Sequence, residues 1–179
     1  QSTAANVNLG ECAPDFTMGF NLHAHYKNLS LSATMDWQKG GCMYNGTLLT
    51  MNFFGVTKES LPYHEGTMVA EGINEATGAK NTVVVSKQAY YQAYNDVTEA
   101  GIFETSYLKL RDVTLSYQFP KLAGINLSVY AFARNVLLWA KMPNLDPESS
   151  QGNNNMGGYF ERFSVPNTSS FGGGLKVTF

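Results

Sequence analysis

The sequence predicts an all-β fold of about five long antiparallel strands, of the kind that form the wall of a large transmembrane β-barrel. The first observation is that residues 106–139 hold two long runs of alternating side chains, joined by a short turn around Pro120. Successive side chains of a strand point to opposite faces, so each run has one apolar face and one mainly polar face. The second observation is length, because a soluble strand usually has about 5–6 residues and a bilayer-spanning strand needs about 9–11.

Composition supports this fold class. The 179 residues suffice for one ordinary domain, and the net charge of −2 gives no case for a nucleic-acid surface or a polybasic membrane patch. Charged residues make up 15%, against about 25% in typical soluble domains. Aromatic residues make up 13%, and there are 17 glycines. Low charge with many aromatic residues is typical of barrels, whose rims carry aromatic girdles.

The first hairpin is predicted in detail. Residues 15–26 and 29–38 alternate cleanly, and Lys27-Asn28 between them fits a two-residue turn. Such a turn fixes the register, which then joins apolar residues only to apolar residues. The predicted pairs are Tyr26 with Leu29, Ala24 with Leu31, Leu22 with Ala33, Phe20 with Met35, and Met18 with Trp37.

Three further strands are predicted at residues 106–119, 125–139 and 170–179, with long connections at 39–105 and 140–168. Within the first connection, residues 45–54 and 86–95 are candidate short helices, the second with Ser86 as its N-cap. In strand 106–119 the alternation breaks near its start. We expect Tyr107, Lys109 and Arg111 to face outward there, so that the membrane-embedded part begins near Asp112.

The connections alternate between short and long. Barrels of the outer membrane have short periplasmic turns and longer extracellular loops. The turns at 27–28 and 120–124 are therefore expected to be periplasmic, and the loops 39–105 and 140–168 extracellular. Aromatic residues then fall in two rows, as expected where rings meet lipid headgroups. The rows are Trp37, Trp139 and Phe171 at the extracellular rim, and Tyr26, Tyr117, Phe119 and Phe179 at the periplasmic rim.

Several segments together resemble one family. The strand YLKLRDVTLSYQFP at 107–120 is the densest match, and the others are LSVYAFARNVLLW, NLDPESS, GGLKVTF and WQKGGCMYNGT. These segments resemble the closing strands and loops of SusC/RagA-type TonB-dependent transporters of the Bacteroidetes outer membrane. Each motif alone is weak, whereas together they are specific.

The resemblance implies a function and several partners. Members of the family enclose a plug in a large barrel, carry a SusD-like surface lipoprotein as a lid, and import oligosaccharides or peptides with energy from the TonB complex. The printed chain shows neither plug nor TonB box, and begins without Met or a visible signal peptide. Five strands cannot close a barrel. We therefore expect a C-terminal segment, residues 1–179, that lies in outer-membrane lipid beside the rest of its own barrel and plug.

Two features near the ends of strands are candidate sites. The last strand ends in Phe179, with Val177 and Leu175 on the same face, and resembles the signal that the outer-membrane assembly machinery reads. The alternative is an ordinary last strand. Cys12 and Cys42 are expected at the same rim of neighbouring strands, and a disulfide between them fits an exported protein. The hairpin register leaves them one residue out of step.

Two loop clusters are candidate contacts with a partner or substrate. Asp146 and Glu148 lie in an acidic, amide-rich loop whose oxygen ligands could bind a calcium ion. Its spacing fits no EF-hand, so we interpret it as a solvated loop that contacts a partner or substrate. Tyr90 and Tyr91 could stack on sugar rings, pack on a partner, or pack within the long loop, together with four further aromatic residues. These are Tyr94, Tyr44, Phe53 and Phe54.

His23, His25 and Asp36 face one side of the first hairpin, near three hydroxyl residues. A metal or catalytic site would need convergent geometry and a further ligand or nucleophile, so we interpret them as residues that line a wet interior. The sequence thus predicts a transporter with no catalytic residue, cofactor or metal. Alternatives are an outer-membrane barrel enzyme, which predicts a Ser–His pair within hydrogen-bond distance, an adhesin, or a soluble β-sandwich binding domain.

Overall fold

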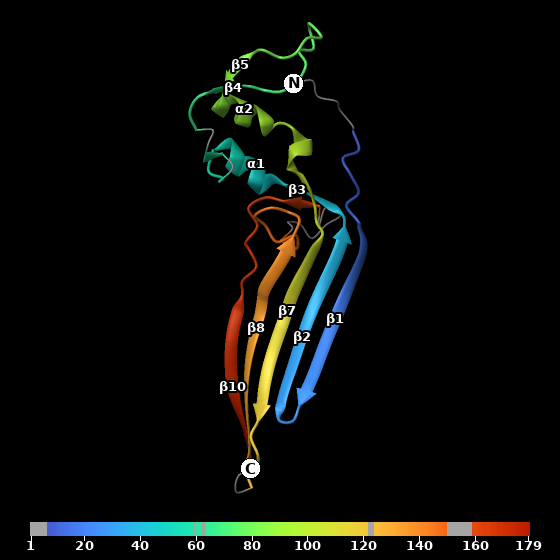
Figure 1. The fold of residues 1–179 in the computed structure, drawn as a ribbon, viewed down its shortest axis with the longest axis vertical. Coiled ribbons are helices and arrows are strands. Elements are labelled where there is room, and N and C mark those ends of the chain that lie inside the picture. Colours follow the sequence, from blue (N-terminus) through green and yellow to red (C-terminus); the bar gives the residue numbers. More distant parts are fainter. Residues whose placement is uncertain (1–6, 59, 62–63, 122–123, 150–158) are drawn as a thin grey trace. The chain divides into compact units, whose positions relative to one another are not determined.

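The computed structural model describes residues 7–58, 60–61, 64–121, 124–149 and 159–179, and its main element is one large antiparallel sheet. The strands lie in the order β1-β2-β7-β8-β10 (Figure 1). Their bounds are Pro14–Tyr26 for β1, Leu29–Gly40 for β2, Tyr107–Gln118 for β7, Asn126–Ala140 for β8 and Ser170–Thr178 for β10. The predicted all-β class with five long antiparallel strands is thereby confirmed.

The described residues form two compact units. One consists of 13–41, 104–121, 124–149 and 165–179, and carries the five-stranded sheet. The other consists of 7–12, 42–103 and 159–164, without the residues outside the description. The second unit holds two short helices and most of the short strands. No helix of the described residues is long and apolar enough to cross a membrane.

The predicted register of the first hairpin is confirmed. Tyr26 pairs with Leu29, and every predicted pair up to Met18 with Trp37 is present. Lys27 takes a positive φ of 54°, as the tight two-residue turn demands. Beyond Phe16 the register shifts by one residue. This bulge was not predicted, and it changes which residues face each other where β1 begins.

A second irregularity lies in the middle of the sheet, at Arg111. Leu110 pairs with Met35 and Asp112 pairs with Thr34, so Arg111 is an extra residue on β7 relative to β2. An extra residue of this kind is a β-bulge, which bends the strand and re-aims a side chain.

The neighbouring strand β8 is irregular at the same level. There Leu110 pairs with Leu137 and Asp112 with Arg134, so two residues of β8 lie opposite Arg111 alone. One of the two is Asn135, whose φ of 50° is left-handed. Asparagine tolerates that conformation better than most residues. The irregularity of β8 at this level therefore has a cause in the local sequence, namely Asn135.

The bulge corrects one prediction about the start of β7. Leu108 pairs with Trp37, on the apolar face, whereas Tyr107 and Lys109 pair with polar residues of β2. The prediction that Tyr107, Lys109 and Arg111 face outward is wrong. The extra residue, Arg111, shifts the alternation by one position, so that Leu108 and Leu110 lie on the same face as Val113 and Leu115. The polar face of the sheet is thus continuous along the whole of β7.

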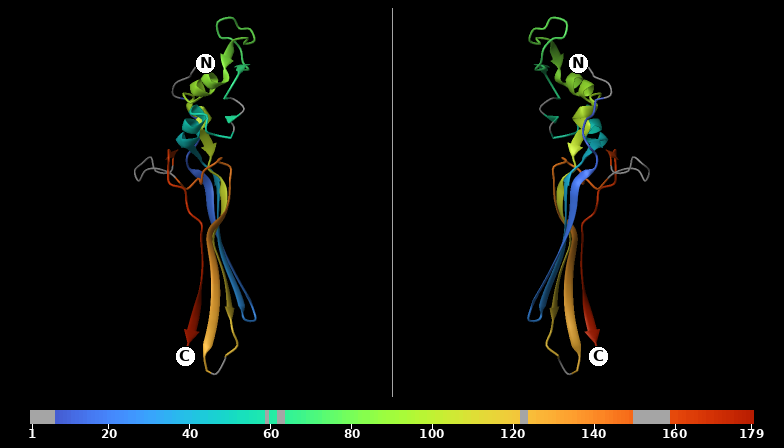
Figure 2. Two further views of the ribbon diagram at one scale, coloured as in Figure 1. Left: turned by 90° about the vertical axis from the view of Figure 1, so that its left-hand side faces the viewer. Right: turned by 90° about the vertical axis from the view of Figure 1, so that its right-hand side faces the viewer.

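The apolar face of the sheet is exposed. Figure 2 shows the five strands nearly edge-on as a single twisted layer. Large apolar side chains on this face remain open, among them Leu22 at 56% and Leu175 at 69%. Four of the predicted rim residues share a level in the register, since Trp37 and Trp139 both pair with Leu108, while Tyr26 and Tyr117 both pair with Leu29. Phe171 instead pairs with Ala133, six residues along β8 from Trp139, so its predicted place in the row of Trp37 and Trp139 is wrong. A soluble β-sandwich would bury such a face against a second sheet.

The opposite face of β10 is built on glycines. A Cβ at Gly172 would lie 2.6 Å from the Phe132 ring, and one at Gly174 would lie 2.7 Å from the Tyr130 hydroxyl. Both rings belong to β8, whose residues pair with these glycines. The aromatic side chains thus lie across β10, in the space that side chains at Gly172 and Gly174 would fill. Covering strand glycines with aromatic rings is an established way to stabilise them.

The second unit contains the two predicted helices. Helix α1 covers Gly46–Phe53 and begins after Asn45, whose side chain accepts a hydrogen bond from the Leu48 amide. Helix α2 covers Lys87–Tyr94 with Ser86 as N-cap, as predicted. A 3-10 turn, η2, covers Thr98–Gly101. The short strands are β3 (Cys42–Asn45), β6 (Ile102–Glu104) and β9 (Phe160–Glu161) in one sheet, and β4 (Thr67–Val69) with β5 (Val84–Ser86) in another.

Candidate functional site

The loop after β8 is fastened to the polar face of the sheet by a network of charges. Lys109 donates to Asp146 Oδ2 at 2.5 Å and to Glu148 Oε2 at 2.8 Å. Arg111 donates from Nη1 to Glu148 at 2.7 Å and from Nε to Asp36 at 2.6 Å, and its Nη2 also pairs with Glu148. The network therefore joins β2, β7 and the loop through five ionised side chains.

Neutral groups also donate hydrogen bonds to the two loop carboxylates. Tyr107 donates its hydroxyl to Glu148 Oε1 at 3.0 Å, and Asn167 donates to Asp146 Oδ2 at 2.8 Å. The other oxygen of Asp146 accepts from the Glu148 amide at 3.1 Å. Each carboxylate thus has a partner on a strand and the Asp146 side chain also closes its own turn. These contacts fasten the part of the loop around Asp146 and Glu148 to the sheet.

Burial makes this network different from an ordinary surface ion pair. The Lys109 side chain is 2% exposed and that of Asp146 10%. Exposed pairs contribute little to stability, whereas removal of one partner of a buried pair leaves an uncompensated charge. The arrangement is therefore a strong anchor of the loop, with Lys109 at its centre.

The pKa values of the loop carboxylates follow from these contacts. Burial raises the pKa of Asp146, but hydrogen bonds from Lys109 and Asn167 outweigh it and leave the pKa below its ordinary value. Burial likewise opposes ionisation of Glu148, and hydrogen bonds from Arg111 and Lys109 lower its pKa overall. Both side chains are ionised at neutral pH.

A second, more exposed charge cluster surrounds Glu104. Lys141 donates to Glu104 Oε2 at 2.5 Å, Lys39 donates to Oε1 at 3.3 Å, and Ser106 also donates to this carboxylate. Hydrogen bonds from Lys141 and then Ser106 lower the pKa of Glu104 to about 2. Glu104 therefore ties the end of β2 to the residue that follows β8.

Sequence reasoning singled out Asp146 and Glu148 but missed their partners. It placed Lys109 and Arg111 on the opposite face, and it assigned no role to Glu104. The signal for the first two was available, because a change of parity within a long strand, from Leu108 and Leu110 to Val113, is what a bulge produces. No comparable signal pointed to Glu104, since its partners come from three separate segments.

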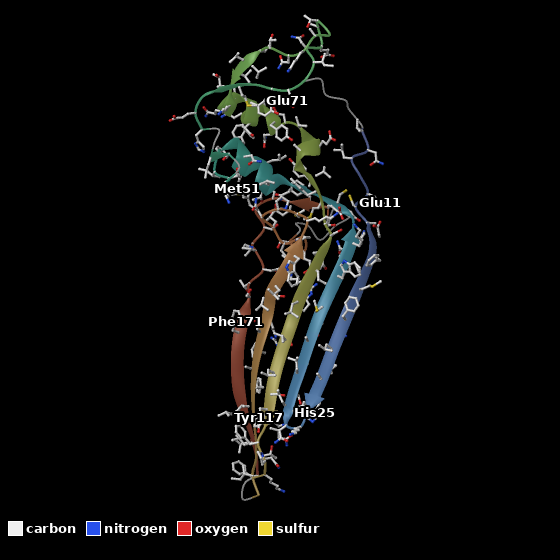
Figure 3. All side chains as sticks on the ribbon, viewed as in Figure 1. Glu11, His25, Met51, Glu71, Tyr117 and Phe171 are labelled. Atoms are coloured by element: carbon white, nitrogen blue, oxygen red, sulfur yellow. The ribbon has the colours of Figure 1, made fainter. Side chains whose placement is uncertain are left out.

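The histidines of the first hairpin lie at its turn end. Figure 3 shows His25 and Tyr117 close to the ends of β1 and β7. His25 Nδ1 lies 2.8 Å from Ser30 Oγ, within a cavity of about 290 Å³ that no described acidic side chain lines. Asp36 pairs in register with Gly19 and binds Arg111, so the structure does not bring it to His23 or His25. Among the described residues no group of three or more His, Cys, Asp and Glu could hold a metal ion.

The predicted aromatic residues of the long connection form two separate clusters. On α2 the Tyr90 ring lies 5.4 Å from Tyr91 and 6.1 Å from Tyr94. Tyr91 also lines a small cavity of about 110 Å³ with Phe53 and Phe54. Tyr44 is not part of this group, because it stacks on a residue of β9.

The two cysteines lie close together in the second unit. Both are free thiols in the structure. The pKa of Cys42 is raised by burial and then by the neighbouring Cys12, which also makes a hydrogen bond with it. The sequence-based register placed the two cysteines one residue out of step. The one-residue shift between Pro14 and Phe16 removes this mismatch. The predicted disulfide therefore keeps its geometric basis.

The end of the last strand is open. Leu175 and Val177 pair with Val129 and Leu127 of β8 and share the apolar face. Phe179 follows β10 and is 95% exposed. The three residues predicted as an assembly signal are thus accessible along one face.

Long antiparallel strands with one exposed apolar face and one polar face define a segment of a β-barrel wall. The comparisons identify the class more closely. Over 190 residues the chain is 26% identical to TonB-dependent receptor P3 of Formosa agariphila, and over 188 residues it is 29% identical to TonB-dependent receptor P26 of the same organism. Each alignment covers 99% of this chain.

The sequence resemblance to TonB-dependent receptors is thereby confirmed. The chain spans 18% of the length of each of these relatives. No family model matches it.

Proposed function

We propose that the chain forms part of the barrel wall of a SusC/RagA-type, TonB-dependent transporter in the bacterial outer membrane. The observation that carries this proposal is the five-stranded sheet, whose apolar face is exposed and whose polar face is lined by charged and hydroxyl side chains. Such a sheet fits a wall between lipid and a wet interior. The similarity to two TonB-dependent receptors supports the same function.

Within this function the long connections shape the extracellular mouth, and the transported nutrient is an oligosaccharide or a peptide. The loop of Asp146 and Glu148, with Tyr90 and Tyr91 of α2, contributes to contacts with substrate or with a SusD-like lipoprotein. The charge network supports this role, because it fastens Asp146 and Glu148 to β7. The remaining barrel, the plug and the TonB complex are the other partners.

The last strand has its own role in this proposal. Leu175, Val177 and Phe179 lie on the lipid-facing side and act as the signal for the machinery that inserts barrels into the outer membrane. Their exposure along one face of an edge strand supports this role.

The test of transport is genetic. A strain that lacks the whole gene is compared with the complemented strain during growth on single oligosaccharides or peptides as the carbon source. Transport predicts slow growth on one class of oligomer and normal growth on its monomers. A second strain with disrupted TonB should show the same defect. Equal growth of the deletion and complemented strains on every oligomer would overturn the proposal.

A serine hydrolase is the second candidate, since His25 and Ser30 lie within hydrogen-bond distance. It competes poorly because no described acidic residue lines the cavity and could orient the imidazole. A fluorophosphonate probe decides the matter with the full-length protein. Labelling that disappears in Ser30→Ala but persists in Ser32→Ala would establish the enzyme, and no labelling would exclude this mechanism.

A further inference from the structure

We propose that a cavity in the second unit, built on Tyr44 and Phe160, binds one pyranose ring of an oligosaccharide. This inference rests on the proposed transport function and assigns to it a substrate class and a subsite. The cavity measures about 460 Å³, within the range of about 300–1,000 Å³ typical of small-molecule sites. Its lining residues are Tyr44, Gly46, Thr50, Asn95, Thr98, Ile102, Tyr159, Phe160 and Arg162.

Two parallel aromatic rings line the cavity. Tyr44 of β3 and Phe160 of β9 pair in parallel register, and their rings stack with centroids 5.4 Å apart and planes 7° apart. The face of an aromatic ring is electron-rich. The axial C–H groups of a pyranose carry a small positive charge and form a flat apolar surface, so the two surfaces match in shape and charge.

The orientation of the Tyr44 ring is fixed by two glycines. A Cβ at Gly46 would lie 3.1 Å from one edge of the ring, and a Cβ at Gly101 would lie 2.7 Å from the other. The absence of side chains at these positions lets α1 and η2 approach both edges of the ring. A ring held in place before binding loses little entropy when a ligand arrives.

Buried polar residues support the platform from the opposite side of the strands. Asn45 and Glu161 follow Tyr44 and Phe160 and are both 0% exposed. The Asn45 side chain caps α1, and Glu161 Oε1 accepts from Thr47 Oγ1 at 2.8 Å and from the Ser164 amide at 2.9 Å. Alternate residues of β3 and β9 therefore line the cavity and anchor it.

The polar side chains of the lining favour a sugar over a peptide. Asn95 and Thr98 bring an amide and a hydroxyl group, each able both to donate and to accept, while the Thr50 hydroxyl donates to the Gly46 carbonyl at 2.7 Å and is left able to accept. Sugar hydroxyls have the same dual capacity and surround the rim of a ring whose faces are apolar. A peptide would instead require ordered partners for its backbone amides and carbonyls.

The test uses the detergent-solubilised full-length protein on an array of pyranose oligosaccharides, with an array of tetrapeptides beside it. We expect binding to one or more glycans. Tyr44→Leu removes the ring but retains an apolar side chain, and should weaken that binding about two- to twelvefold, the equivalent of the roughly 0.5–1.5 kcal/mol of an aromatic contact. Tyr44→Phe keeps the ring and should bind normally. Limited proteolysis of both variants checks that the unit folds.

The matched control is Phe163→Leu, which also replaces an aromatic ring by an aliphatic side chain. This residue belongs to the same unit, is 59% exposed, and is not among the residues that line the cavity. The inference is overturned if no glycan binds, if only peptides bind, or if Tyr44→Leu binds as tightly as the wild type. Those results leave transport itself standing when the deletion strain still fails to grow on an oligomer. Conversely, ring-dependent glycan binding without any growth defect would refute transport and keep the subsite.

Discussion

The ammonium group of Lys109 lies 2.5 Å from Asp146 Oδ2, and this contact joins a buried strand residue to a loop 37 positions further along the chain. The Lys109 side chain is 2% exposed and that of Asp146 10%, so the pair is largely shielded from water. It therefore connects the described part of the loop after β8 to the middle of the sheet.

Replacement of Lys109 by Met is expected to release this loop. The variant leaves the Asp146 and Glu148 carboxylates without their buried cation, which costs about 3–5 kcal/mol in comparable pairs. Limited proteolysis of the full-length protein in detergent should show faster cleavage between residues 141 and 149. Lys176→Met, on the exposed surface of β10, serves as the control and should be cleaved like the wild type.

A double variant sharpens this prediction. Lys109→Met combined with Asp146→Asn removes one of the stranded charges, and should recover part of the protection that Lys109→Met loses. If the double variant is cleaved as fast as the single one, or if the single one is as resistant as the wild type, the charge network is not the anchor.

Acidification is expected to loosen the same loop. The folded-state pKa values of Asp146 and Glu148 lie below the ordinary values of 3.8 and 4.5. A lowered pKa contributes stability that is present above the ordinary value and is lost as the pH falls through the folded-state value. Hydrogen exchange of residues 141–149 should therefore be slow at neutral pH and, after correction for the intrinsic rate, faster below about pH 4. Protection that is constant down to pH 2 would contradict this.

Cys12 and Cys42 are expected to form a disulfide in the exported protein. Their thiols are close enough for a hydrogen bond, and Gly10 packs so tightly that a Cβ there would lie 3.0 Å from Cys42 Sγ. Mass spectrometry of the peptide pair, without and then with reductant, should show the gain of two hydrogens on reduction. Cys12→Ser provides the control, and two free alkylatable thiols in the unreduced wild type would disprove the bond.

Gly172→Val is expected to disturb the pairing of β10 with β8. The new side chain would meet the Phe132 ring, since even a Cβ lies 2.6 Å from it, and overpacking of this kind costs about 1–3 kcal/mol. The amount of heat-modifiable, folded barrel should fall. Phe132→Ala in the same chain opens the space and should restore the yield. Failure of the second substitution to rescue the first would show that another contact is responsible.

A pair of neighbouring residues on β7 tests the orientation of the sheet. Leu115 is 46% exposed on the apolar face, and Ser116 is on the polar face. Lysine on the lipid side of a barrel costs about 2–4 kcal/mol near the bilayer midplane, while residues of the lumen tolerate charge. Leu115→Lys should therefore lower the folded yield in the outer membrane and Ser116→Lys should not. If Ser116→Lys lowered the folded yield and Leu115→Lys did not, the face that carries Ser116 would be the one in contact with lipid.

The first hairpin shows how much of the fold local rules can predict. The two-residue turn at Lys27-Asn28 and the parity of the strands each define the register, and all five predicted pairs from Tyr26–Leu29 to Met18–Trp37 are present. The bulge at Arg111 was missed, although the change of parity between Leu110 and Val113 is its signature in the sequence. The shift beyond Phe16 carries no such signal, because it depends on how β1 and β2 meet.

The candidate site was harder to predict than the fold. Asp146 and Glu148 stand out in sequence because acidic residues are few, but their role depends on which face Lys109 and Arg111 occupy. That face is set by one bulged residue. The Tyr44 cavity combines β3, α1, η2 and β9, segments far apart in the chain, and single-sequence patterns carry no information on their proximity.

The bulge at Arg111 also has a consequence for how this strand changes during evolution. Without that residue, the segment from Leu108 to Leu115 would alternate without interruption, and every neighbour would keep its face. Loss of Arg111, or equally of Asp112, would restore the alternation along β7, whereas loss of any other single residue between Leu108 and Leu115 would not. Loss of Arg111 would also remove the guanidinium group that connects Asp36 to Glu148. A relative with a regular strand here must hold its loop by other means.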